Sequence, residues 1–211
     1  MENLKTLIDR ASSQIYDLVL RTDLSKATIL SKKLDNNIFL KREDKQLVKS
    51  FKIRGAYNKI KNLKEQIKVG QEIFACSAGN HAQGVAIAGN KLNIPTNIIM
   101  PTFTPEIKIN GVKRFGGKVI LNGGDFDSAK KECLRLVEEN QGILVDPFND
   151  YDIIAGQGTI GKELFEQIDK IDYLFCPVGG GGLISGITSY IKSINNDTKI
   201  IGVETFDSNS M

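Results

Sequence analysis

The chain has 211 residues, enough for one large domain or two small ones, and for a core that needs no disulfide or metal. Hydrophobic residues make up 41% and charged residues 25%, which excludes bulk disorder and a collagen-like fold. The net charge of +3 does not favour a nucleic-acid or membrane partner, and no apolar run approaches the roughly 18 residues that span a bilayer.

Apolar spacing and the positions of glycine and proline predict helices and strands that alternate along the chain. In chain order, the expected elements are a helix over 4–19, a strand over 37–40, a helix over 51–63, a strand over 72–76, a helix over 80–92, a strand over 96–100, a helix from Pro105 to the glycines at 116–117, a strand over 118–121, a helix with Asp125 as N-cap, a strand over 142–145, a helix over 153–168, a strand over 173–176, a helix over 183–194 and a strand over 200–204.

This alternation is typical of an α/β fold with open, mostly parallel sheets covered by helices. The strands between 72 and 145 are expected to make one small sheet, and the strands near Ile38, Phe175 and Val203 a second one. Ligands of such sheets bind where the strands end. Three predicted loops lie at strand ends, at 77–80, 101–105 and 178–182.

The cysteines and the histidine exclude some chemistries. Cys76, Cys133 and Cys176 are scattered and odd in number, and no secretory signal precedes them, so we expect reduced, buried, structural thiols and a cytoplasmic protein. His81 is the sole histidine, which excludes a zinc site with several histidines, and no metal is expected.

Positive charge is concentrated in the segment from Lys41 to Lys68, which has ten basic and three acidic residues. Two interpretations stay open, a solvated helix face or a site for an anionic ligand.

The segment Pro177-Val178-Gly179-Gly180-Gly181-Gly182-Leu183 lies between a predicted strand and a predicted helix. Glycines let the backbone N–H groups approach a ligand, and a helix N-terminus adds free donors, so the segment suits a phosphate. It matches neither the Walker A pattern nor G-x-G-x-x-G, which disfavours a nucleotide. A loose loop is the alternative.

Two further segments carry candidate groups. Ser77-Ala78-Gly79-Asn80 follows a strand and opens a helix, which suits an oxyanion or carboxylate, although ordinary N-capping by Ser77 or Asn80 explains it equally well. His81 by itself is more typical of a satisfied helix residue than of a catalyst. Lys52, between Phe51 and Ile53 and near other cations, is placed to have the lowered pKa that a Schiff-base lysine needs.

Together these segments resemble one enzyme family. Ser50-Phe51-Lys52-Ile53-Arg54-Gly55-Ala56, then 77–84 and 178–183, resemble the serine/threonine dehydratases, pyridoxal-phosphate enzymes of fold type II (tryptophan synthase β-like). The likeness runs from about Leu18 to the end. The stretch 41–46 resembles the biosynthetic threonine ammonia-lyases, although Leu47 stands where that group often has proline.

The resemblance implies a role for each matching residue. Lys52 would carry pyridoxal 5′-phosphate covalently and later move the Cα proton of the substrate, and Phe51 would pack against the cofactor ring. Asn80 would donate a hydrogen bond to the ring's 3′ oxygen. The phosphate would be held by Gly179, Gly180, Gly181, Gly182 and Leu183, and the substrate carboxylate by Ser77, Ala78, Gly79 and Asn80.

The implied activity is deamination of L-threonine to 2-oxobutanoate and ammonia, the first step of isoleucine biosynthesis, a branched-chain amino-acid pathway. Ile53 disfavours threonine and cysteine synthases, which usually have aspartate after the lysine, and Ala78 disfavours racemases, which tend to have serine there. An L-serine or broader hydroxy-amino-acid dehydratase, or a truncated non-catalytic remnant that only binds the cofactor, stay open as alternatives.

The resemblance also implies a domain arrangement. Residues 52–151 would form a small α/β domain, and 1–51 with 152–211 a large cofactor-binding domain. Because the sequence stops at 207–211, just after a predicted strand, we expect a fragment whose large domain lacks its C-terminal part. Relatives are commonly dimers or tetramers, so the full-length protein is expected to be a homo-oligomer that acts on a small amino acid.

Overall fold

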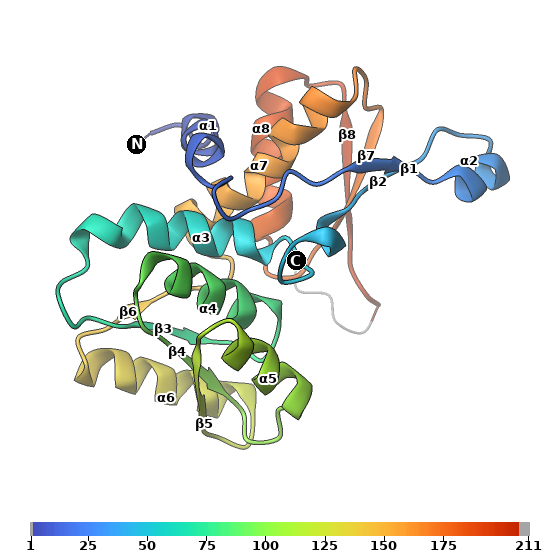
Figure 1. Ribbon diagram of the computed structural model, residues 1–211. Helices are drawn as coiled ribbons and strands as arrows, with labels where there is room; N and C mark the ends of the chain where they lie inside the picture. The colour runs from blue at the N-terminus through green and yellow to red at the C-terminus, as the bar shows by residue number, and fades with distance from the viewer. Residues whose placement is uncertain (1, 207–211) are drawn as a thin grey trace.

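A parallel four-stranded sheet occupies the lower half of Figure 1, in the computed structural model that describes residues 2–206. Its strands are β3 (Ile73–Cys76), β4 (Thr96–Met100), β5 (Lys118–Leu121) and β6 (Ile143–Leu144), in the spatial order β5-β4-β3-β6. All three pairings are parallel. The small open sheet expected between residues 72 and 145 is therefore confirmed.

Helices cover both faces of this sheet because its central strands are apolar on both faces. Ile98 and Met100 belong to the core that includes α3 (Lys52–Leu63), α4 (Asn80–Leu92) and α5 (Glu106–Arg114). Phe74 and Ile99 point the other way, into a core closed by α6 (Phe126–Glu139). Fully buried strands of this kind are typical of parallel sheets. Asp125 is the N-cap of α6, as predicted, and its side chain accepts from the Ser128 N–H.

The upper half of Figure 1 is built on helices α1 (Leu4–Gln14), α7 (Tyr151–Gln167) and α8 (Gly182–Ile194). Two parallel strands, β7 (Tyr173–Pro177) and β8 (Lys199–Val203), pair beside them. Cys176 packs with Ile187 and Ile191 of α8. On the face of β7 that points away from α8, Tyr173 and Phe175 are exposed.

Helix α7 touches three other helices, and glycines make this possible. A Cβ atom at Gly156 would lie 2.6 Å from the Arg54 carbonyl oxygen on α3. A Cβ at Gly158 would lie 2.5 Å from the Ile8 side chain on α1, and one at Gly186 of α8 would lie 2.7 Å from the Gly158 nitrogen. The backbones of α7 and α8 thus cross in direct contact.

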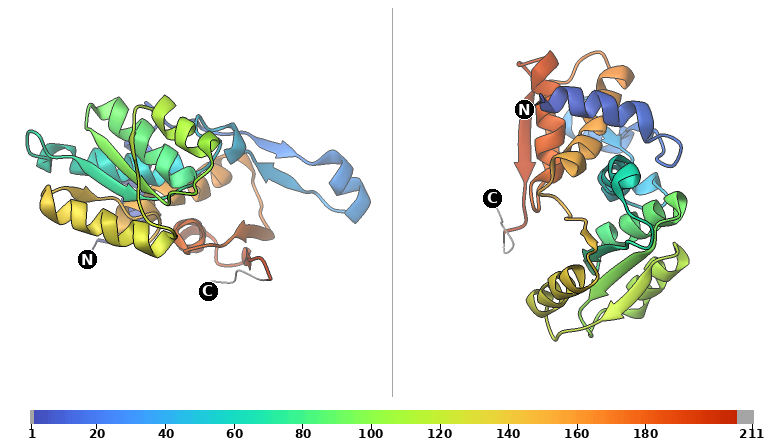
Figure 2. Two further views of the ribbon diagram at one scale, coloured as in Figure 1. Left: turned by 90° about the horizontal axis from the view of Figure 1, so that it is seen from below. Right: turned by 90° about the vertical axis from the view of Figure 1, so that its left-hand side faces the viewer.

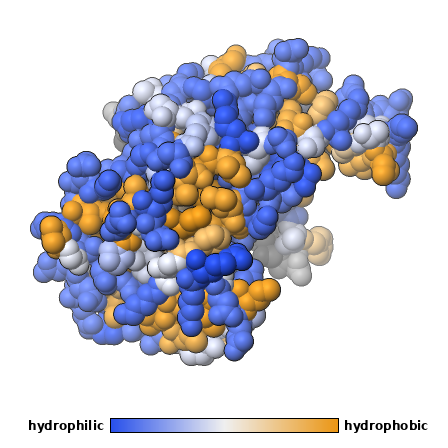
Figure 3. Space-filling model, viewed as in Figure 1, coloured by the Kyte–Doolittle hydropathy of each residue, from blue (hydrophilic) through white to orange (hydrophobic). Residues whose placement is uncertain are grey.

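A hairpin arm projects from the body, as the left view of Figure 2 shows. It consists of β1 (Leu24–Lys26), α2 (Thr28–Leu34) and β2 (Phe39–Lys41), with β1 and β2 antiparallel. The expectation that the strand near Ile38 joins the sheet of β7 and β8 was wrong, because β2 pairs with β1 instead. Ile29 and Leu34 are exposed on α2, and apolar surface is visible on the arm in Figure 3.

The first helix is shorter than predicted. It ends at Gln14, with Ile15 as C-cap, although Ile15 and Val19 are buried. The chain turns there and keeps both side chains in the core that α3 shares. Short 3-10 helices follow at Glu43–Lys45 and Lys64–Gln66. Over residues 2–206 no helix is long and apolar enough to cross a membrane, and the segment 207–211 used in the fragment prediction lies outside the described residues.

Candidate active site

Lys52 is the first residue of α3 and its amine is held inside a cleft. Lys52 Nζ donates to the Pro147 carbonyl oxygen at 2.9 Å and lies 5.5 Å from the ring centroid of Phe51 and 6.0 Å from that of Phe148. Burial lowers the pKa of the Lys52 amine, and the negative charge of Asp146 only partly offsets this. The lowered pKa raises the fraction of neutral amine, the form that acts as nucleophile or base.

Lys52 and the glycine loop line the same cleft, although they lie more than a hundred positions apart in the sequence. It has a volume of about 180 Å³ and is lined by Phe51, Lys52, Phe148 and residues 177–184. A larger hollow of about 270 Å³ lies among Val178, Ile184, Gly202 and Glu204 and does not include the lysine. The smaller hollow is therefore the candidate site.

The glycine loop leads from β7 into α8 and presents the start of that helix to the cleft. Gly181, the N-cap of α8, has a φ of 79°, a conformation that favours glycine. No side chain caps α8, so its first N–H groups are open to an anion. The loop is not loose, because Gly180 and Gly182 lie against Phe148.

The segment Ser77–Asn80 lies at the carboxyl end of β3 and does not line the cleft. The N-cap of α4 is Gly79, without a side-chain cap, so the capping explanation for Ser77 or Asn80 was wrong. Instead Ser77 Oγ accepts from the Gly79 N–H at 3.2 Å. One turn after Asn80, on the same face of α4, Gly84 lies against the Lys52 backbone, where an added Cβ would be 3.2 Å from the carbonyl oxygen. This places Asn80 near the start of α3.

His81 is buried beside these groups and is only half satisfied. Its Nε2 lies 3.0 Å from the Val145 carbonyl oxygen, whereas its Nδ1 has no hydrogen-bond partner among the residues that the structure describes. Burial lowers the pKa of His81 to about 4, the Val145 contact partly opposes this and the charge of Lys52 adds to it. The ring is therefore neutral at pH 7, with its proton on Nε2, because that nitrogen faces a carbonyl oxygen.

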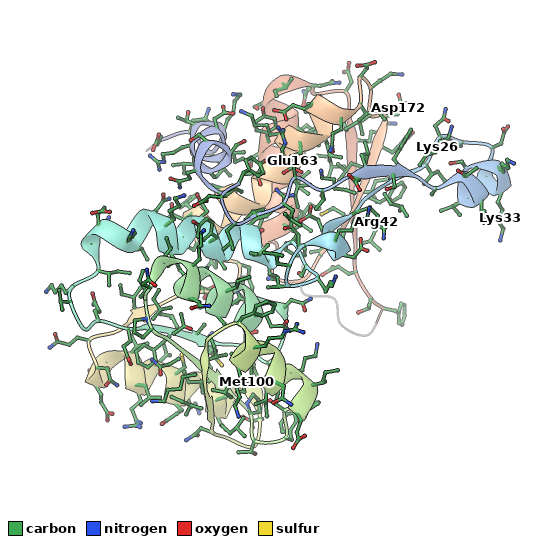
Figure 4. The ribbon with its side chains drawn as sticks, viewed as in Figure 1. Lys26, Lys33, Arg42, Met100, Glu163 and Asp172 are labelled. Atoms are coloured by element: carbon green, nitrogen blue, oxygen red, sulfur yellow. The ribbon has the colours of Figure 1, made fainter. Side chains whose placement is uncertain are left out.

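Arg54 anchors the start of α3 through a buried ionic network. It donates to Glu163 Oε1 on α7 at 2.6 Å and to both carboxylate oxygens of Glu43 at 2.8 Å. Lys41 Nζ reaches the other oxygen of Glu163 at 2.5 Å. Arg54 and Glu163 are fully buried, and Figure 4 marks Glu163 inside the body on α7. Burial opposes both charges, but the ion pairs outweigh it, raising the pKa of Arg54 and lowering that of Glu163.

This network also bears on the two interpretations of the basic segment. Six of its ten cations form ion pairs with carboxylates, namely Lys41, Arg42, Lys45, Arg54, Lys59 and Lys61. Much of the positive charge is therefore neutralised within the fold. Lys52 donates instead to the Pro147 carbonyl oxygen and lines the cleft.

Phe148 is a cleft residue that the sequence analysis missed. It follows Pro147, which indicates only the end of the preceding strand, and it belongs to no periodic apolar pattern. Its ring lies against Gly180 and its backbone against Gly182. The one available signal was its position at the carboxyl end of a parallel strand.

Comparisons with known proteins add the family. Residues 15–211 match the profile of the family described as "Pyridoxal-phosphate dependent enzyme". The chain belongs to this family. It is 49% identical over 203 residues to the mitochondrial threonine dehydratase of Schizosaccharomyces pombe, with 95% of this chain and 34% of the relative covered. It is 50% identical over 211 residues to a biosynthetic L-threonine dehydratase of Staphylococcus saprophyticus, covering 97% of this chain and 50% of the relative.

Solved structures of family members have the same fold. The processed form of threonine deaminase isoform 2 from Solanum lycopersicum superposes with a TM-score of 0.91 at 46% identity, over 95% of this chain and 55% of that chain. Maize serine racemase gives a TM-score of 0.90 at 36% identity, over 94% and 60% of the two chains. Fold type II is thereby confirmed. The chain spans about a third to a half of the length of these two curated relatives.

The residues of the cleft fit the cofactor that gives the family its name. A lysine amine with a lowered pKa faces the cleft beside the aromatic ring of Phe51. A Cβ at Gly179 would meet no atom within 4 Å, so this side of the loop is open, and the uncapped start of α8 supplies N–H donors for a phosphate. An aldehyde, an aromatic ring and a phosphate thus each find suitable groups.

Proposed function

We propose that the protein is a threonine ammonia-lyase, or the part of one that contains the cofactor lysine, and that it converts L-threonine to 2-oxobutanoate and ammonia. The observation that carries this is the single cleft shared by Lys52 and the glycine loop. The relatives named threonine dehydratase, at 49% and 50% identity, support threonine as substrate. The maize relative named serine racemase is less similar, at 36%.

Pyridoxal phosphate, when bound, withdraws electrons from the Cα of an amino acid and so makes loss of the Cα proton feasible. Lys52 would bind the cofactor and then, as a free amine, remove that proton. The Pro147 carbonyl oxygen holds Nζ in place, and burial lowers the pKa of the amine, which raises the fraction of free base. Loss of the β-hydroxyl as water, followed by hydrolysis, yields 2-oxobutanoate and ammonia.

The remaining roles concern binding. N–H groups of residues 179–183 would hold the phosphate, and Phe51 would pack on the ring. Asn80, at the start of α4, would reach the 3′ oxygen. The loop 77–80 would bind the substrate carboxylate through the uncapped N-terminus of α4. Domain boundaries at 51/52 and 151/152, a homo-oligomer and a cytoplasmic location belong to the same proposal, although relatives in fission yeast and tomato are named mitochondrial and chloroplastic.

A visible absorption spectrum with added pyridoxal phosphate, followed by L-threonine, tests the proposal. We expect a lysine–cofactor band that Lys52→Ala abolishes and that the exposed-lysine control Lys64→Ala retains, together with formation of 2-oxobutanoate from threonine. L-serine lacks one methyl group of threonine, a difference that a pocket distinguishes by only about 1–3 kcal/mol, so both substrates are assayed. Faster turnover of L-serine would favour a serine dehydratase. A band without turnover would indicate a cofactor-binding remnant, and no band would refute the proposal.

A further inference from the structure

The segment 145–148 connects the groups of the cleft to one another. Its Val145 carbonyl accepts from His81 of α4, and its Pro147 carbonyl accepts from Lys52 of α3. Asp146 Oδ1 accepts from the N–H groups of Phe148 and Asn149 at 3.1 and 2.9 Å. The backbone on which Phe148 sits is therefore fixed from several sides.

The side chain of Phe148 is directed at the glycine loop. A Cβ at Gly180 would lie 2.3–2.6 Å from three atoms of the Phe148 ring, closer than any real contact. A Cβ at Gly182 would lie 3.0–3.1 Å from the carbonyl oxygen, Cα and Cβ of the same residue. A Cβ at Gly179 would meet nothing. Phe148 thus requires glycine at position 180 and leaves little room at position 182, whereas an added Cβ at Gly179 would point into open space.

Phe148 also lines the cleft itself. Its ring centroid is 6.0 Å from Lys52 Nζ, and the side chain retains 38% of its exposure although it packs on the loop. The ring is thus partly exposed on the side that faces the cleft. The ring therefore touches the loop on one side and the ligand space on the other.

We propose that Phe148 is a positioning residue for phosphate binding, which sets the backbone of the glycine loop so that its N–H groups face the Lys52 amine. This inference rests on the proposed function. Phe148 contributes no proton and no charge. It acts by filling the space beneath Gly180 and Gly182, and without it the loop has no fixed distance from the lysine.

The test compares two ligands that differ only in the phosphate, pyridoxal phosphate and pyridoxal. In Phe148→Ala we expect affinity for pyridoxal phosphate to fall about tenfold, equivalent to about 1.4 kcal/mol, with affinity for pyridoxal within about twofold of wild type. Phe148→Tyr should behave as wild type, because the ring atoms nearest Gly180 are Cγ and the two Cδ atoms, away from the hydroxyl position. Phe126→Ala, at an exposed phenylalanine on α6, is the matched control.

Each outcome decides. Equal losses for both ligands would mean that Phe148 only supports the fold, and no loss would mean that the loop holds its shape alone; either overturns the inference while leaving the proposed function intact. Failure of wild type to bind pyridoxal phosphate would refute the proposed function, and the inference with it. If thermal unfolding shows that Phe148→Ala does not fold, Phe148→Leu replaces it with the same expected ratio between ligands.

A second measurement tests the packing directly. Gly180→Ala should weaken binding of pyridoxal phosphate because its methyl group collides with the Phe148 ring. In a Phe148→Ala background the same substitution should add less than about twofold, since the ring is gone. Fully additive losses would show that Gly180 serves the ligand rather than Phe148, and would overturn the inference.

Discussion

Replacing Arg54 by methionine should destabilise the protein strongly. The change removes two contacts to Glu163 and two to Glu43. Within residues 2–206 it leaves the fully buried Glu163 with Lys41 as its only cationic partner. Breaking a buried pair in this way costs about 3–5 kcal/mol, a large share of the roughly 5–15 kcal/mol typical of a whole domain.

The pH dependence of this loss has a defined sign. In the wild type the pKa of Glu163 is lowered, so its contribution is present above the unfolded pKa of about 4.5 and is lost as pH falls. Without Arg54 the burial of Glu163 dominates and its pKa rises, so protonation at mildly acidic pH relieves the variant. The stability difference between wild type and Arg54→Met should therefore shrink between pH 7 and pH 5.

Urea unfolding followed by circular dichroism at both pH values measures this difference. The double variant Arg54→Met/Glu163→Met should be less destabilised than the sum of the single variants, because it removes both buried charges together. A loss below about 1 kcal/mol at pH 7, a difference that does not change with pH, or full additivity would refute the reasoning.

Two further predictions concern stability. The pKa of His81 falls from 6.5 to about 4 on folding, so as pH falls the unfolded chain takes up a proton on this ring before the folded chain does. The free energy of unfolding of wild type should therefore fall by about 2 kcal/mol between pH 8 and pH 5, and this fall should be absent in His81→Asn. Parallel pH curves for the two proteins in urea unfolding would contradict this. Gly186→Ala should cost at least about 1–3 kcal/mol, since its methyl group meets the backbone of α7, whereas Gly124→Ala, in open space, should stay within about 0.5 kcal/mol; equal melting temperatures would contradict this.

Most of the α/β frame could be predicted from the sequence because its central helices and strands are long, have a regular apolar spacing and are bounded by glycine or proline. The helix at 80–92 and the strand at 96–100 have the predicted bounds. The arm at 24–41 was largely missed because β1 and β2 have three residues each and α2 has seven, too short for a period to show. The first helix was predicted too long because Ile15 and Val19 are buried and continue its apolar spacing after the helix has ended.

In the candidate site, too, the residues with a local sequence signature could be predicted and the others could not. Lys52 and the glycine loop were identifiable because lysine chemistry and glycine runs have local signatures, and the structure brings them into one cleft. The partnership of Arg54 with Glu163 spans 109 positions and has no local signature. Phe148 also has no local sequence signature, because its role depends on Gly180 and Gly182, which approach it only in the folded chain.

The glycines of α7 have a consequence for how the chain folds. Each glycine inside a helix costs about 0.5–1 kcal/mol relative to alanine, and α7 contains Gly156, Gly158 and Gly161. Taken by itself α7 is thus a poor helix, about 1.5–3 kcal/mol weaker than an alanine-substituted one. It gains its stability only when α1, α3 and α8 close on the positions that glycine leaves open. Ordering of this helix, of the anchored start of α3 and of the loop before α8 should therefore occur in one cooperative step.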